Sequence, residues 1–111
     1  MRIALRNCEY AILNILDTSG SLHGYGILQA LQSFNTPIPP ATLYAALRRL
    51  RCLNLVNVER VTTNMGPVRN IHHITYQGRA QLCKRNNEIL LRVEELHTLY
   101  KSKLLSLRQL L

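Results

Sequence analysis

The chain has 111 residues, of which 47% are hydrophobic, a composition typical of one globular domain and not of a disordered segment. Fourteen lysines and arginines against six acidic residues give a formal charge of +8 at pH 7, which indicates a polyanionic partner, either nucleic acid or an anionic membrane surface. No stretch approaches the roughly 18 uninterrupted apolar residues of a transmembrane helix, so none is predicted.

Three helices are predicted in the first half of the chain. Apolar residues recur at helical spacing over residues 3–16, and turn-forming residues follow them. A second helix is predicted over residues 25–33, and the prolines after it exclude both helix and central strand. A third helix begins at or just after Pro40, because proline suits a first helical position, and ends at Asn54. Its apolar face consists of Leu43, Ala46, Leu47 and Leu50.

A β-hairpin and a long helix are predicted in the second half. Residues 55–61 and 70–74 have the pattern of two strands that flank a turn containing glycine and proline. A final helix, which Thr75 can cap, runs over residues 76–111. This order predicts a mainly α fold with a small β-hairpin wing, the winged helix-turn-helix design with a long C-terminal helix. We expect residues 1–75 to form the winged unit, and the whole chain to be one compact domain.

The third predicted helix carries residue types that suit DNA on the face opposite its leucines. At 100° per residue, that face holds Ala41, Ala45, Arg48, Arg49 and Cys52, with Thr42 and Tyr44 on its flanks. Small alanines permit a close approach, and guanidiniums contact phosphates or the edge of guanine. The alternative is that these arginines only solvate an exposed face. Arg69, beside the hairpin turn, is a candidate for a phosphate or minor-groove contact, and Tyr25 is either a phosphate contact or part of the edge of the core.

Hydrophobic residues recur every three or four positions along the final predicted helix. They include Ile89, Val93, Leu96, Tyr100, Leu104 and Leu107. The compact part of the chain is too small to cover such a helix, so we expect these residues to join two subunits about a two-fold axis. The alternative is a basic amphipathic helix that lies on a membrane. The glutamates at positions 88, 94 and 95 dilute the positive charge and favour a water-facing polar side, so no membrane partner is expected.

No catalytic or metal site is predicted. The three cysteines, Cys8, Cys52 and Cys83, are odd in number and lack metal-ligand spacing, which indicates a reducing, cytoplasmic setting. His72 and His73 are neighbours on a predicted strand, so they point to opposite faces and cannot share one metal ion. The sequence has no carboxylate pair, no nucleophile beside a base and no phosphate-cradling glycine loop. We therefore expect no enzyme activity and no cofactor.

Five stretches of the sequence resemble the PadR family of bacterial transcriptional regulators. They are residues 22–27 (LHGYGI), 40–50 (PATLYAALRRL), 53–56 (LNLV), 66–69 (GPVR) and 74–79 (ITYQGR). In family terms they are similar to the HGY-x-I segment, the TLY-x-AL-x-RL recognition helix with the residues after it, the wing, and the LT-x-x-G-R start of the C-terminal helix. The resemblance spans about residues 9–80, and the combination of the first two motifs is specific to the family.

The resemblance implies a homodimer joined through its C-terminal helices, usually together with the N-terminal helix. Such dimers bind a palindromic operator, usually repress, and work in the bacterial cytoplasm on the nucleoid. The chain departs from the family at Gly26, Ala45, Val68 and Asn70, where glutamate, proline and basic wing residues are usual. It also lacks the tryptophan that drug-binding members carry, so the resemblance does not settle whether the protein binds a small-molecule effector. Short members without an evident ligand site include a cyanobacterial clock-modifying regulator, and this chain could be of that kind.

Together these observations predict a homodimeric regulator that binds double-stranded promoter or operator DNA in a sequence-specific way. The residues expected to contact DNA are Thr42, Tyr44, Arg48, Arg49, Arg69 and Tyr25. The alternative is a protein-interaction module that dimerises through its long helix and whose basic surface is incidental. DNA binding that survives only at very low salt, without sequence preference, would favour this alternative.

Overall fold

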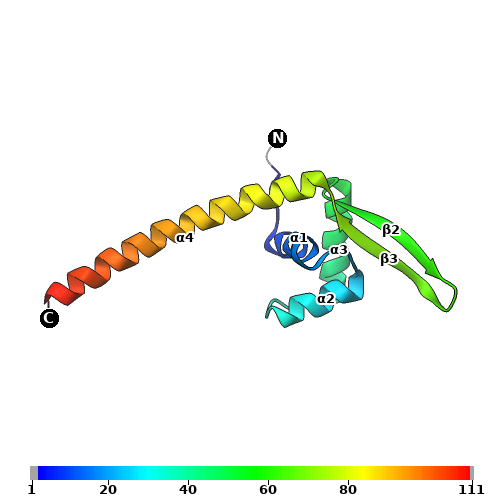
Figure 1. The fold of residues 1–111 in the computed structure, drawn as a ribbon, viewed down its shortest axis with the longest axis horizontal. Helices are drawn as coiled ribbons and strands as arrows, with labels where there is room; N and C mark the ends of the chain where they lie inside the picture. The colour runs from blue at the N-terminus through cyan, green and yellow to red at the C-terminus, as the bar shows by residue number, and fades with distance from the viewer. Residues whose placement is uncertain (1–2, 111) are drawn as a thin grey trace.

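The structure is a computed structural model that describes residues 3–110. Its elements follow in the order α1 (Asn7–Ser19), β1 (Leu22–His23), α2 (Gly24–Ser33), α3 (Pro40–Cys52), β2 (Val56–Thr63), β3 (Gly66–Ile74) and α4 (Tyr76–Leu110). The first three helices lie together beneath the near end of α4, and the β2–β3 hairpin projects to the other side of α3 (Figure 1). The predicted mainly α fold with a small hairpin and a long last helix is confirmed.

The helix ends follow local rules that the sequence displays. Gly20, with a φ of 83°, ends α1 in a conformation that other residues avoid. The His23 ring caps α2, since its Nδ1 accepts a hydrogen bond from the Gly26 N–H at 2.8 Å. The hydroxyl of Thr75 accepts a hydrogen bond from the Gly78 N–H at 2.9 Å, which confirms the predicted cap of the last helix.

The described strands form one antiparallel sheet in the order β1–β3–β2. β2 pairs with β3 from Val56 opposite Ile74 as far as the hairpin turn, and β1 pairs on the other side of β3, with Leu22 opposite His72. The sequence analysis predicted the hairpin but not β1, because a two-residue strand is too short to show an alternating pattern. β3 also begins four residues earlier than predicted, so the wing is longer than the turn residues indicated.

One hydrophobic core joins the three short helices, the base of the sheet and the start of α4. It includes every residue of the predicted apolar face of α3. Its fully buried large side chains are Ile12, Leu13, Ile27, Leu31, Leu43, Leu50 and Leu55, joined by Leu82 from α4. Because the third helix buries this face, its opposite face is available to solvent.

The first part of α4 is fixed to α1, and the remainder leaves the domain. Arg79 pairs with Asp17 of α1 at 3.3 Å, and the guanidinium of Arg85 lies 5.5 Å from the centre of the Tyr10 ring. Beyond this contact the described residues of α4 are exposed, and the helix extends away from the other elements (Figure 1). Within residues 3–110 no helix is apolar over a length that would cross a lipid bilayer.

Gly78 lies in the first turn of α4, where the helix touches the segment that leaves α3. A Cβ atom at this position would lie 2.2 Å from the Leu55 carbonyl oxygen and 2.8 Å from a side-chain carbon of Ile74. The N–H of Thr75 donates to the same Leu55 oxygen at 3.0 Å, which holds the two segments together. This close approach sets the direction in which α4 leaves the wing.

We expect Gly78→Ala to destabilise the protein, although helix propensity alone would favour alanine by about 1 kcal/mol. The added methyl group meets a backbone atom, so the free energy of unfolding should fall by about 1–3 kcal/mol. Chemical denaturation measures this change, and Gln77→Ala, at an exposed neighbouring position, serves as the control. A Gly78→Ala variant as stable as the wild type would show that the backbone at Leu55 moves aside at little cost.

Candidate nucleic-acid interface

The exposed face of α3 carries the small, hydroxyl-bearing and basic residues that were predicted to lie there. Thr42, Tyr44 and Arg48 are all exposed, and the exposed alanines Ala41 and Ala45 have short side chains that permit a close approach to the helix. Arg51 is exposed on the same side, one turn after Arg48, although the sequence analysis did not assign it to the site. Its spacing of three residues from Arg48 is the signal that could have found it, because such residues are neighbours on a helix.

Arg49 behaves differently from its neighbour Arg48. Its guanidinium forms an ion pair with Glu9 of α1 and also donates to the Ala4 carbonyl oxygen at 3.0 Å. The Glu9 side chain is 1% exposed and accepts a further hydrogen bond from the Arg6 N–H at 2.8 Å. Helical angle alone placed Arg49 on the DNA face, but its side chain is held toward α1. Its predicted DNA contact stays a prediction, and the contact that the structure does show joins α3 to the N-terminal segment.

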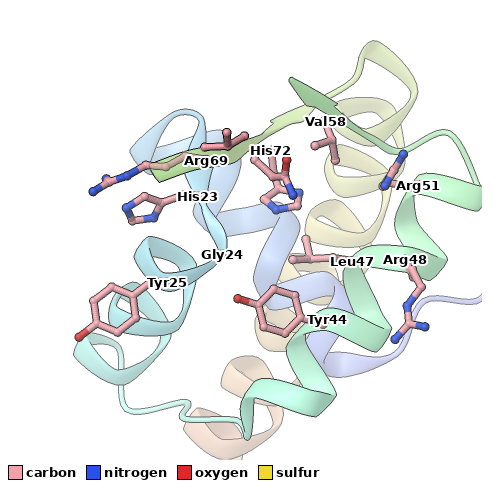
Figure 2. Close-up of a pocket in the computed structure, with 12 residues that line it drawn as sticks. His23, Gly24, Tyr25, Tyr44, Leu47, Arg48, Arg51, Val58, Arg69 and His72 are labelled. Carbon is pink, nitrogen blue, oxygen red and sulfur yellow. The ribbon is translucent and has the colours of Figure 1, made fainter. Parts of the chain in front are cut away.

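An open cavity of about 640 Å³ lies between the wing and the second and third helices (Figure 2). Four of the six predicted DNA-binding residues line it, namely Tyr25, Tyr44, Arg48 and Arg69. The other lining residues are His23, Gly24, Leu47, Arg51, Val58, Val68, Asn70 and His72. This surface therefore combines three arginines and two tyrosines from three separate elements and contains no carboxylate. Thr42 does not line this cavity and lies beside a separate hollow with Arg49.

Tyr44 forms the wall of the cavity between α3 and α2. A Cβ atom at Gly24 would lie 2.9 Å from the Tyr44 hydroxyl oxygen and 3.0 Å from its ring, so the ring packs against the first turn of α2. Figure 2 shows the Tyr44 hydroxyl directed toward Gly24. A larger residue at position 24 would displace the ring. The glycine thus lets one tyrosine connect the second and third helices at the exposed surface.

His72 and His73 point to opposite faces of the sheet, as predicted. His73 lies outside the cavity, with its Nδ1 2.6 Å from the Ser21 hydroxyl and its Nε2 2.9 Å from a Glu59 carboxylate oxygen. His72 is on the buried face and is 7% exposed. Burial lowers its pKa first of all, and the positive charge of Arg51 and the neighbouring His73 lower it further. In the part of the chain that the structure describes, no three His, Cys, Asp or Glu side chains gather as a metal site would require.

The arrangement of these elements defines the class of the protein. A three-helix unit whose third helix presents arginines beside a β-hairpin is the winged helix-turn-helix architecture of DNA-binding proteins. The family model described as "Transcriptional regulator PadR-like family" matches residues 12–84, and the chain belongs to this family. It is therefore a transcriptional regulator of the PadR-like family with a winged-helix fold.

Solved structures of the same family share its fold. A PadR-like transcription factor from Bacteroides fragilis is 25% identical, with a TM-score of 0.72 over 82% of this chain and 87% of that chain. A PadR family regulator from Clostridium difficile R20291 is 20% identical, with a TM-score of 0.76 over 84% and 97% of the two chains. Bacillus subtilis PadR, in complex with operator DNA, is 21% identical, with a TM-score of 0.64 over 71% and 46%. No curated protein sequence gives a significant match.

Proposed function

We propose that the protein acts as a homodimer that binds a palindromic operator and represses transcription. The observation that supports DNA binding most directly is the acid-free cavity with its three arginines beside the exposed face of α3. Because DNA presents phosphates on both sides of its major groove, a basic helix flanked by a basic wing complements it. The Bacillus subtilis relative, which was crystallised with operator DNA, supports the same use of this fold.

Five of the six predicted contacts keep their place in this proposal. Thr42, Tyr44 and Arg48 lie on the exposed side of α3 and would face the major groove. Arg69 on the wing and Tyr25 in the first turn of α2 would contact phosphates on either side. We add Arg51 to this set because it shares the cavity with Arg48. We assign Arg49 to positioning α3, since its guanidinium is already engaged by Glu9.

The dimer is proposed from the surface of α4 that the single chain leaves uncovered. Ile89, Val93, Leu96, Tyr100, Leu104 and Leu107 are between 43% and 65% exposed. An apolar hollow of about 340 Å³ also lies between α1 and the end of α2, lined in part by Ile15, Leu31 and the exposed ring of Phe34. A partner helix packed along α4 and into this hollow would cover both surfaces. This agrees with the family arrangement, in which the N-terminal helix takes part.

Selection of bound sequences from random DNA duplexes tests this proposal. A homodimer with a two-fold axis should enrich a palindrome whose half-sites lie about one or more helical turns apart. If no sequence is enriched and binding disappears above very low salt, the basic surface is incidental. The protein-interaction module, which docks a partner on the long helix, would then be the better account. A reporter placed behind the selected operator distinguishes repression from activation.

Alanine at Arg48 and at the adjacent Arg49 should have different effects. Arg48→Ala removes an exposed guanidinium and should weaken specific binding by about 1–3 kcal/mol if it reads a base edge, without loss of stability. Arg49→Ala leaves the buried Glu9 carboxylate without its cation and should lower the free energy of unfolding by about 2 kcal/mol. Operator titration and chemical denaturation of both variants measure the two effects. Equal results for the two arginines in both assays would contradict the separation of roles.

A further inference from the structure

His72 is a buried polar side chain at the back of the wing cavity, and the roles proposed above leave it unused. It is 7% exposed, and its Nδ1 has no hydrogen-bond partner among the described residues. Figure 2 shows its ring directed from β3 toward α3, above Leu47 and Tyr44. β3 is the central strand, with Leu22 and Val58 opposite His72 on its two sides, so the position of the ring is well fixed.

The groups that surround His72 are cationic or neutral. Tyr44, Arg48 and Arg51 line the cavity from α3, His23 from β1, Tyr25 from α2 and Arg69 from β3, while β2 contributes only Val58. The acids of the packed elements are engaged elsewhere, because Glu9 pairs with Arg49, Asp17 with Arg79, and Glu59 with His73. The cavity therefore gathers positive charge without a counter-charge from the chain itself.

We propose that this cavity binds a phosphate group of the DNA backbone and that His72 takes up a proton from solvent when the phosphate enters. The inference rests on the proposed DNA-binding function and deepens it. A phosphate is the group that DNA offers to this surface, and its charge complements the arginines at the edges of the cavity, with Arg48 and Arg51 on one side and Arg69 on the other (Figure 2). Histidine is the side chain that can change its charge near neutral pH, and of the two imidazoles that line the cavity His72 is the buried one with an unpartnered Nδ1, whereas the Nδ1 of His23 accepts a hydrogen bond from the Gly26 N–H.

The coupling follows from the electrostatics of the free and bound states. In the free protein, burial and the positive charge of Arg51 lower the pKa of His72, so the ring is neutral at pH 7. A phosphate beside Arg51 offsets that repulsion and stabilises the imidazolium, which raises the pKa in the complex. The complex then binds more protons than the free protein, so DNA affinity must rise as the pH falls through the range between the two pKa values.

Isothermal titration calorimetry in buffers of different ionisation enthalpy measures the proton uptake directly. A random-sequence duplex at low salt suffices, because a backbone contact does not depend on the bases. We expect the wild type to take up as much as about one proton per protomer on binding, and its affinity to rise by up to about tenfold per protomer for each pH unit lowered. His72→Gln should abolish this uptake. His73→Gln, which removes the adjacent ring on the opposite face, should retain it.

Stability is followed at each pH so that unfolding is not mistaken for weak binding. Because the folded state holds the pKa of His72 below 6.5, the free fold loses stability as the pH falls through 6.5 toward the lowered value. Circular dichroism of the same samples shows whether each variant is folded. The proton uptake of the wild type tests the proposal even if a variant fails to fold.

Four outcomes are distinguishable. Proton uptake on DNA binding that His72→Gln removes supports the proposal. DNA binding by the wild type without proton uptake, or with uptake that His72→Gln retains, overturns it and leaves the proposed function intact. No DNA binding at any pH overturns both. Proton uptake on adding inorganic phosphate, at constant ionic strength, with none on adding the duplex would overturn the assignment to the DNA backbone and identify a site for free phosphate.

Discussion

Raising the salt concentration from 50 to 200 mM should weaken duplex binding by on the order of 10³-fold or more, if six or more phosphates are contacted. Each chain carries a net charge of +8, so two chains carry 2 × (+8) = +16. Each neutralised phosphate releases condensed counterions, and added salt opposes that release. Fluorescence anisotropy of a labelled duplex over a salt series gives the slope of the logarithm of the affinity against the logarithm of the salt concentration, which we call the salt slope. A nearly flat salt dependence would contradict the proposal that this surface binds DNA.

Single arginine variants show which residues contribute to the salt dependence of DNA affinity. Arg69→Ala on the wing should weaken binding to all sequences about equally and lower the salt slope by about one. Arg108→Ala, which removes the same charge far along α4, is the matched control and should leave the slope almost unchanged. A slope that falls equally in both variants would mean that net charge, and not the wing, determines DNA binding.

The helices were predictable because their signals are local and strong. Pro40 marks the start of α3, and the repeated leucines after it define the buried face without knowledge of any other segment. The strands of the sheet were harder to predict from the sequence. β1 has two residues and exists only because β3 is available to pair with it. Gly66 and Pro67 have the composition of a turn, yet the hairpin ladder extends through them.

The site was only partly predictable, because it depends on contacts between distant segments. Tyr25 and Arg69 were chosen for separate reasons, and tertiary packing brings both to one cavity with Tyr44 and Arg48. The same packing removes Arg49 from that surface, since Glu9, forty residues earlier, is buried beside it. A helical wheel describes only one helix and contains no information about α1. The burial of His72 likewise depends on β1 and α3, which the alternation of one strand cannot reveal.

An aspartate at Val93 or Leu96 should dissociate the dimer and weaken operator binding by about 10²-fold or more. Both positions lie in the apolar band of α4, and both are more than half exposed in the single chain. A carboxylate buried there without a cation costs several kcal/mol, which opposes association of the two subunits. A monomer would engage one half-site and lose the advantage of two tethered contacts. Light scattering and operator titration on the same sample measure both effects.

Thr98→Asp separates an effect on assembly from an effect of charge. Thr98 lies on the same segment of α4 but about 180° from the centre of the band, so its variant adds an identical charge outside the proposed interface. It should remain dimeric and bind the operator almost normally. Neither Val93 nor Leu96 belongs to the proposed DNA surface, so a binding defect in their variants must act through assembly. If Leu96→Asp stays dimeric and binds normally, the subunits do not join through this face of α4. The proposal that dimerisation through α4 positions the protein on a palindromic operator would then be wrong.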